Sequence, residues 1–329
     1  MNHANYHKEL RYLRNHEINF IKWDDCINNA HNGSLYAFSW YLDFICEEWE
    51  GIVLDDYLAV MPLLTRKISG VKYVYTSRLA NQLGVFSTEI MDKNMVNTFL
   101  DKVNRTFKIF EINLNKFNTI DSSVLRQKNN NTYEFDLITN YDIIRSAYSQ
   151  ALLDGIDHAN RNHLHIFRGV TPSEFMEFIN DKLVVVSIKQ KKGTIYRLHR
   201  IADFMINHEL GDIYGAYSPL NKLCAAVFFL KSKRQASMLF SGISQEGFRL
   251  KAMELLVDLF IRDNAEKNIT LNFENLAIPN KEKFFTGFGA KNFHFTTVKN
   301  TRNPFLFRRL RLNNLSGLLE KFPNNKRYL

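Results

Sequence analysis

The same order of predicted elements occurs twice along this chain, and that repeat limits the fold more than any single motif. In the first half, hydrophobic periodicity predicts a helix, strands, a helix and a strand at residues 39–49, 51–68, 72–77, 95–106 and 108–115. In the second half, the corresponding elements fall at residues 195–210, 212–219, 222–232, 236–242, 248–266 and 269–275. A glycine-containing loop precedes the second helix in each half, at 79–87 and 243–247. The repeat predicts two α+β domains, each with a mixed sheet flanked by helices.

The polar run RQKNNN at 126–131 marks the join between the two halves. Apolar alternation predicts a strand at 132–138, and helical spacing predicts a helix within 141–160. Thr171, Pro172 and Glu174 predict a helix start, with Thr171 as N-cap and Glu174 as the capping-box acid. We therefore predict an N-terminal domain of residues 1–138 and a C-terminal domain of residues 139–329 that ends in a basic tail.

Composition indicates a soluble globular protein. The chain has 329 residues, 45% of them hydrophobic, so each half is long enough to bury a core. Three cysteines without a CxxC pair make a disulfide framework unlikely and favour a reducing compartment. The N-terminus lacks an apolar signal segment, and no stretch approaches the roughly 18 uncharged apolar residues that a spanning helix needs. We therefore expect a cytoplasmic protein.

Positive charge is concentrated in the second half of the sequence. Residues 1–150 carry a formal net charge of −2 and residues 151–329 one of +11. The last 39 residues hold nine Lys and Arg against one acid, Glu320. A basic end fits an anionic partner such as RNA, a phosphorylated metabolite or a lipid surface. A solvated tail that keeps the protein soluble explains the same charge equally well.

A candidate anion site lies where the predicted strand 236–242 turns into the next helix. Free backbone N–H groups and the positive helix end attract phosphate at such a turn. Ser241, Gly242, Gln245 and Gly247 are the candidate donor-binding residues. An ordinary loop with Glu246 as a helix-capping acid is the alternative. No metal site is expected, because the nearby histidines His158, His163 and His165 are not supported by a cysteine pair or an HExxH motif.

The stretch LNFENLAIPNKEKFFTGFGA at 271–290 resembles the closing motif of Fem-type peptidyltransferases, in which a strand ends D/N-F-E-G-S and F-Y-x-G-F-G-A follows a short helix. The matching residues are Asn272, Phe273, Glu274, Phe284, Phe285, Gly287, Phe288, Gly289 and Ala290. Segments 82–87 and 214–232 resemble two further Fem segments, so the resemblance extends from about Trp40 to Pro304. Asn275 and Leu276 depart from the family's Gly-Ser, and 153–293 contains no coiled-coil arm.

The resemblance implies two tandem GNAT-like domains that transfer an acyl or aminoacyl group to an amine. The donor is aminoacyl-tRNA in Fem proteins, which act on a peptidoglycan precursor, and acyl-CoA in related families. Those acyl-CoA families hold the CoA pyrophosphate in a Q/R-x-x-G-x-G/A loop. Here that pattern, started at Gln245, meets Phe248 and Leu250 where glycines are required. The donor is expected as a co-substrate, with no tightly bound cofactor.

The resemblance also suggests roles for single residues. The donor's acyl arm would lie between diverging strands 236–242 and 269–275, with Glu274 at the opening to accept the amine's proton. A helix-capping or salt-bridged acid is the alternative reading of Glu274. Tyr217 is a candidate general acid, and Tyr214 and Gln82 are candidates to bind the acceptor. Asn275 and Phe285 are candidates to bind the donor, whereas Gly287 and Gly289 would end a short helix.

The sequence thus predicts a bacterial, cytoplasmic N-acyltransferase of the Fem-related type acting on an amine of a cell-envelope or polysaccharide precursor. One alternative is an acetyl-CoA-dependent GNAT acetyltransferase that acts on a small amine. A second is a non-catalytic module that binds RNA or a membrane surface. The basic tail favours the second alternative, because PFLFRRLRLNNLSGLLEKF at 304–322 mixes arginine with apolar residues as peripheral membrane segments do.

Overall fold

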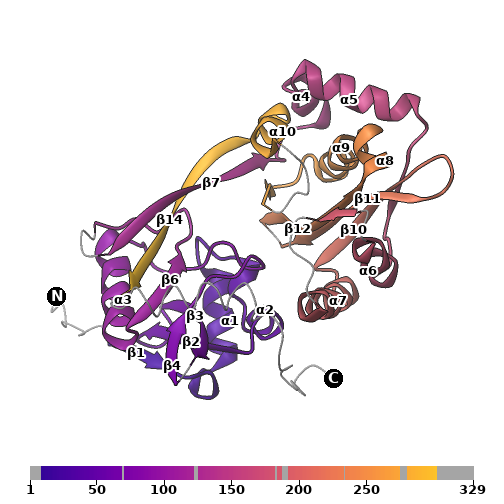
Figure 1. Cartoon of the computed structure of the whole chain (residues 1–329). Coiled ribbons are helices and arrows are strands. Elements are labelled where there is room, and N and C mark those ends of the chain that lie inside the picture. Colours follow the sequence, from indigo (N-terminus) through magenta and orange to yellow (C-terminus); the bar gives the residue numbers. More distant parts are fainter. Residues whose placement is uncertain are drawn as a thin grey trace. The chain divides into compact units, whose positions relative to one another are not determined.

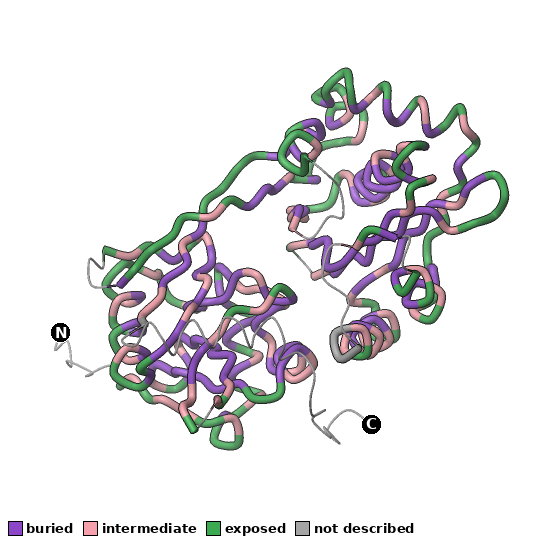
Figure 2. The backbone as a smooth tube through the Cα atoms, viewed as in Figure 1, coloured by how far each residue is buried: buried purple, intermediate pink, exposed green. Residues whose placement is uncertain are grey.

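The chain forms two compact units (Figures 1 and 2). In this computed structural model the described residues are 9–68, 70–121, 125–181, 184–186, 192–232, 234–274 and 280–301. Unit 1 comprises residues 1–130 and 294–329, and unit 2 comprises residues 131–293. Asn275 and the basic tail from residue 302 onward lie outside the described residues, so their predicted roles stay predictions.

Unit 1 is a mixed sheet with helices on both faces. Its strands are β1 (Leu10–Leu13), β2 (Glu48–Leu54), β3 (Ala59–Ile68), β4 (Val71–Val74), β5 (Phe86–Ser87) and β6 (Ile109–Asn113). Parts of β7 (Arg126–Asp136) and β14 (Lys291–Thr301) complete the order β1-β2-β3-β4-β6-β14-β7, with β5 paired to β3. The helices are η1 (Asn15–Glu17), α1 (Phe20–Asn29), η2 (Leu35–Ala37), α2 (Ser39–Ile45) and α3 (Lys93–Thr106). Among the strand pairs of unit 1 with a described register, β4 and β6 are parallel and the other pairs are antiparallel.

Helix α3 covers one face of the unit 1 sheet. Asp92 caps its N-terminus by accepting a hydrogen bond from the Met95 N–H at 2.8 Å. Its buried residues recur at helical spacing and pack on β2, β3 and β6 in one core. On the other face, the buried Trp23 of α1 lies against Gly51 of β2, where a Cβ would stand 2.5 Å from the indole ring. Glycine at position 51 therefore lets α1 approach the sheet closely.

Unit 2 has the same plan. Its strands are the second part of β7 together with β8 (His165–Arg168), β9 (Val184–Val186), β10 (Gly211–Tyr217), β11 (Leu223–Lys231), β12 (Gln235–Ser244) and β13 (Thr270–Asn272). They follow the order β7-β13-β12-β11-β10-β8, and β9 pairs with β12. The helices are α4 (Tyr141–Ser146), α5 (Gln150–Arg161), α6 (Pro172–Asn180), α7 (Lys192–Asn207), α8 (Gln245–Arg249), α9 (Ala252–Asn264) and α10 (Lys281–Gly287).

The unit 2 sheet is buried on both faces. On one face Phe260 of α9 stacks on Phe229 of β11, with the ring centroids 3.7 Å apart and the planes 8° from parallel. On the other face Phe175 of α6 meets Phe228 of β11 and Phe240 of β12 edge-on. Phe228 and Phe229 are neighbours in β11, so adjacent residues of one strand serve two different cores.

The predicted repeat of elements is confirmed in its order. Each unit has a helix, a three-stranded meander, a second helix and a final strand, as α2-β2-β3-β4-α3-β6 and α7-β10-β11-β12-α9-β13. β5 and α8 are inserted before the second helix, and the strand predicted at 51–68 is divided between β2 and β3. In both units the final strand lies parallel to the last meander strand. Parallel neighbours require a crossover, which α3 and α9 provide. The α+β class with mixed sheets and flanking helices is therefore correct.

The division of the chain differs from the predicted boundary at 138/139. The run RQKNNN, predicted as the join, is instead the first part of strand β7 and is largely exposed. Its polar residues can form a strand because neighbouring strands of the sheet supply hydrogen-bond partners for the backbone. Residues 294–301 belong to unit 1, because β14 pairs with β6 from Thr297↔Asn113 to Thr301↔Ile109. The chain thus returns to its first unit after completing the second. Two predicted helices are also interrupted, at 147–149 and at Leu250–Lys251.

The stacked rings of unit 2 give a stability prediction. Phe260→Ala removes a fully buried ring, so we expect it to lower the free energy of unfolding by about 3–5 kcal/mol. Phe167→Ala in β8 removes a ring that is 54% exposed and should change it by less than about 1 kcal/mol. Urea unfolding of both variants measures the difference. Equal effects would contradict the packing described here.

Candidate active site

The pairing of β13 with β12 in unit 2 stops after three residue pairs, from Gln235↔Thr270 to Ser237↔Asn272. Farther along the same strand, residues Gly242–Ser244 of β12 pair with β9 in antiparallel fashion. The residues in between, 238–241, pair with β11 on the other edge of β12. We call this interval, 238–241 of β12 together with the end of β13, the β12–β13 gap. The sequence predicts that strands 236–242 and 269–275 diverge in this region, and a donor arm between them stays a prediction.

Glu274 lies two residues beyond the end of β13, beside the β12–β13 gap. Its side chain is half-buried, and its Oε1 atom is shielded from solvent. Ser241 belongs to the gap and is fully buried. Because β12 and β13 run parallel, the chain leaving Asn272 advances past Ser237 toward Ser241. The position of Glu274 at the opening of the gap stays a prediction.

The turn from β12 into α8 is more closed than the predicted phosphate loop. The Ser244 hydroxyl accepts a hydrogen bond from the Gly247 N–H at 3.1 Å, which engages one of the donors that a phosphate would need. A Cβ at Gly247 would stand 2.2 Å from the Cys224 carbonyl oxygen, so this glycine permits close packing of α8 on β11. Gly242 is covered by Val184 of β9, whose Cγ1 lies 3.1 Å from the position of a Cβ. Gln245 is exposed at the first position of α8.

Tyr214 and Tyr217 lie on opposite faces of β10 and do not form one site. The Tyr214 hydroxyl donates to Asp263 at the end of α9 at 2.8 Å, on the face that carries the Phe229–Phe260 stack. The Tyr217 hydroxyl donates to Glu174 of α6 at 2.6 Å. Glu174 is thus the partner of Tyr217 instead of the predicted capping-box acid, although Thr171 does cap α6.

The pKa of Tyr217 is raised, chiefly by burial and also by its hydrogen bond to Glu174. The phenol therefore stays protonated at neutral pH and donates a hydrogen bond to Glu174. Phe285 is also part of the protein interior, because it packs on Tyr133 and Phe273 and is buried. The structure thus gives Tyr217 and Phe285 packing partners within unit 2. Gly289 has φ +84° just after α10, so the predicted helix ending at Gly287 and Gly289 is confirmed.

Gln82 lies in unit 1, in a segment held by a cluster of buried amides. Its Oε1 atom accepts a hydrogen bond from the Lys116 N–H at 3.0 Å. Asn118 accepts from the Val85 N–H at 2.7 Å and donates to the Val85 carbonyl at 3.0 Å. Asn115 and Asn32 donate to that carbonyl as well. The Gln82 carboxamide oxygen is therefore engaged within unit 1, in fixing the segment 82–87.

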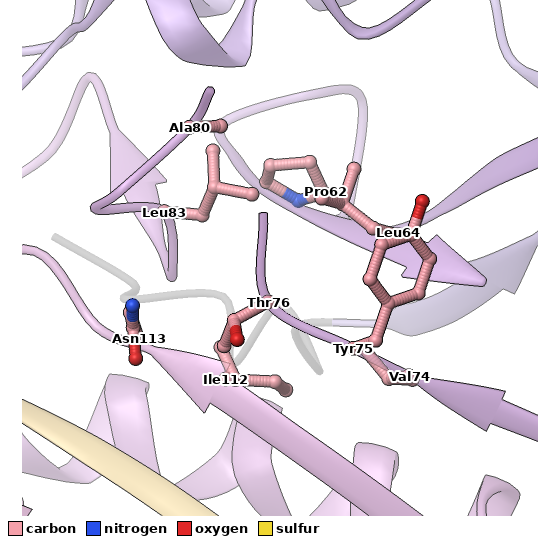
Figure 3. A pocket seen from close by; sticks show the side chains of 9 residues that line it. All are labelled: Pro62, Leu64, Val74, Tyr75, Thr76, Ala80, Leu83, Ile112 and Asn113. Atoms are coloured by element: carbon pink, nitrogen blue, oxygen red, sulfur yellow. The ribbon is translucent and has the colours of Figure 1, made fainter. Parts of the chain in front are cut away.

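This fixed segment forms one wall of a narrow pocket at the divergence of β4 and β6 (Figure 3). The two strands pair only at Val74↔Phe110, and Leu83 then takes the place beside β6 through a bridge to Leu114. Figure 3 shows Leu83 and Pro62 on one side of the pocket and Ile112 on another. The cavity volume is about 10 Å³, which holds roughly one water molecule. This narrow pocket therefore has no room for a substrate arm.

Several site features could not be found from the sequence. Asn32, Asn115 and Asn118 read as ordinary loop residues, and their contacts span up to 83 positions. Arg168 and Asp263 are 95 positions apart, yet two hydrogen bonds join them beside Tyr214. The only available signal was the density of asparagines near the predicted strand 108–115.

Thiol and metal chemistry receive no support from the described residues. The cysteines form no disulfide. Burial raises the pKa of the Cys26 and Cys224 thiols to about 12, with further contributions from Asp25 and Glu246 respectively, so neither is a nucleophile at neutral pH. Among the described residues, no group of three His, Cys, Asp or Glu side chains is placed to hold a metal ion. No helix in this described part is long and apolar enough to cross a membrane.

Solved structures with the same architecture align with nearly the whole chain. A FemX crystal structure aligns over 92% of this chain and 99% of its own at 10% identity, with a TM-score of 0.58. L-PGS from Bacillus licheniformis aligns over 90% and 96% at 10% identity, with a TM-score of 0.53. The C-terminal domain of a putative lysylphosphatidylglycerol synthetase from Agrobacterium fabrum aligns over 91% and 99% at 11% identity, with a TM-score of 0.51.

The chain has the fold of FemX, built here from two units with the same order of elements. The expected resemblance in fold is therefore confirmed by the structure. No protein-family model matches the sequence, and no curated protein matches it. At identities of 10–11% the structural likeness shows the fold alone.

The Arg168–Asp263–Tyr214 cluster predicts a pH-dependent contribution to stability. Burial raises the pKa of Asp263, but hydrogen bonds from Arg168 and Tyr214 outweigh it, and the net pKa is lowered. The contribution is therefore present above the unfolded-state pKa of about 3.9 and is lost as pH falls through the lower folded-state value. Asp263→Asn should reduce the free energy of unfolding by roughly 1 kcal/mol at neutral pH, and less in acid. Urea unfolding at neutral pH and in acid, below the folded-state pKa, measures the difference. An equal loss of unfolding free energy at both pH values would refute the role given to the Asp263 carboxylate.

Proposed function

We propose that this chain is a cytoplasmic aminoacyltransferase that moves an aminoacyl group from aminoacyl-tRNA to an amine of a cell-envelope precursor. The observation that supports the proposal is the position of Glu274, two residues beyond the strand that pairs with only the beginning of β12, in a chain of which 92% aligns with FemX. Two further neighbours of this fold are named L-PGS and lysylphosphatidylglycerol synthetase. Aminoacyl transfer to an envelope component is thus the activity that these names share with the resemblance to Fem proteins.

The surroundings of β12 support aminoacyl-tRNA over acyl-CoA as the donor. An extended acyl-CoA arm that reaches from Glu274 to the α8 turn would run beside residues 238–244 of β12. β9 pairs with the last three of these residues, and one strand edge has room for one neighbour. At the α8 turn, Ser244 already binds the Gly247 N–H, and Glu246 adds a carboxylate. Both features disfavour a bound pyrophosphate.

The chemistry requires one proton acceptor and a positioned amine. The acceptor amine attacks the carbonyl carbon of the aminoacyl ester, a C–N bond forms, and the C–O bond to the tRNA ribose breaks. The ribose hydroxyl departs with a proton, and the attacking nitrogen loses one. In the proposed site the Glu274 carboxylate takes the proton from the nitrogen, directly or through water. An ester is activated already, so positioning supplies much of the remaining rate.

Glu274→Gln tests the proposed base. The full chain is incubated with tRNA charged with radiolabelled amino acids, and UDP-linked muropeptide or phosphatidylglycerol is supplied as acceptor. We expect label transfer to one acceptor, with kcat lowered about 10²-fold or more in Glu274→Gln. Glu282→Gln removes an exposed acid of α10 as the matched control and should leave kcat unchanged. Undiminished transfer by folded Glu274→Gln would remove Glu274 from the mechanism.

Thermal unfolding with acetyl-CoA tests the choice of donor. A ligand at 100 times its Kd stabilises a protein by about 2.7 kcal/mol, which shifts the melting temperature measurably. Because β9 occupies the edge of β12, we expect no shift with CoA or acetyl-CoA. A clear shift would favour the alternative, an acetyl-CoA-dependent acetyltransferase.

A further inference from the structure

A wide pocket lies in unit 1 at the opposite end of β4 from the narrow Leu83 pocket. It is lined by the ends of β1 and β3 and by the beginnings of β2 and β4, together with η1. The narrow pocket contains Val74, the last residue of β4, whereas the wide one contains Lys72 near the start. Its cavity volume is about 490 Å³, within the range of small-molecule sites. The proposed transfer chemistry uses none of its residues.

The β3–β4 hairpin places two positive charges against each other in this pocket. Lys67 and Lys72 are direct partners in the antiparallel register. Like charges in that position destabilise a strand pair. Lys72 is compensated by an ion pair with Glu50, which is 4% exposed and also accepts a hydrogen bond from Tyr12. Lys67 is exposed and forms no ion pair within the described part of the chain.

A second source of positive charge lines the same pocket from η1. The Arg14 backbone N–H is engaged by Glu17 at 2.7 Å. Its guanidinium is exposed and, among the residues that the structure describes, has no carboxylate partner. His16 lies two residues on and lines the pocket too. Among the residues that line the pocket, Glu48 is the one exposed carboxylate, since Glu50 is neutralised by Lys72. Glu17 of η1 lies nearby, with its carboxylate on the Arg14 backbone N–H.

We propose that this pocket binds a phosphorylated ligand of about nucleotide size, with Lys67 and Arg14 contacting the phosphate. A phosphate group would offset the charge that Lys67 brings opposite Lys72. The planar arginine fork can donate two parallel hydrogen bonds to a pair of phosphate oxygens, and lysine adds a point charge. The buried Glu50, held by Tyr12 and Lys72, fixes the floor of the pocket. The site is separate from the β12–β13 gap and does not depend on the proposed transfer reaction.

Calorimetric titration of the full chain with inorganic pyrophosphate and with ADP tests the proposal. We expect saturable binding at one site, weakened about tenfold or more in Lys67→Gln and in Arg14→Gln. Lys128→Gln removes an exposed lysine of β7 in the same unit and should change Kd less than about twofold. Glu48→Gln removes the exposed carboxylate and should strengthen binding. That gain cannot arise from a folding defect.

A vesicle arm distinguishes the source of the phosphate. Phosphatidylglycerol vesicles are sedimented with the wild-type chain and with Lys67→Gln, with and without pyrophosphate. Lipid binding that is lost in Lys67→Gln and blocked by pyrophosphate would identify a lipid headgroup as the ligand. Pyrophosphate binding without such sedimentation would identify a soluble phosphate ester. No saturable pyrophosphate binding, or equal effects of Lys67→Gln and Lys128→Gln, would overturn the proposal.

Discussion

Parallel strand pairing that ends early is the constraint on which both units depend. β13 stays beside β12 for three residue pairs, and β4 meets β6 at only one. Parallel neighbours must be joined by a crossover, so the packing of α3 and α9 on the sheets decides where the strands meet and how soon they part. Where they part, the longer strand has backbone groups that require another partner. Each unit meets that requirement with a segment of its own chain.

The two units meet this requirement differently. In unit 1, Leu83 bridges to Leu114 beside β6, and the buried amides of Asn32, Asn115 and Asn118 hold its segment. The remaining space is about the size of a water molecule. In unit 2, β13 pairs with the beginning of β12 and β9 with its far end, so residues 238–241 lie between the two pairings. Glu274 follows β13 in the same unit.

Unit 1 carries its accessible polar surface at the other end of its sheet. There the β3–β4 hairpin, η1 and the beginning of β2 place both basic and acidic side chains around a pocket of about 490 Å³. The buried Glu50 forms an ion pair with Lys72 and not with Lys67. Desolvating a carboxylate is costly unless it is paired, so the Glu50–Lys72–Tyr12 cluster is a fixed part of the fold. In the proposed phosphate site, the exposed Lys67 and Arg14 beside this cluster are the groups that contact the ligand.

The amino-acid sequence by itself determined the repeated order of elements, the α+β class and the turn after α10. These features depend on local periodicity and on one glycine in the left-handed region, Gly289. The separation of Tyr214 from Tyr217 is local too, because side chains three positions apart in a strand point to opposite faces. Only the tertiary structure decided that β14 returns to unit 1, that β9 occupies the edge of β12 and that Glu174 binds Tyr217. Those contacts join residues tens to hundreds of positions apart, and no local pattern specifies such partners.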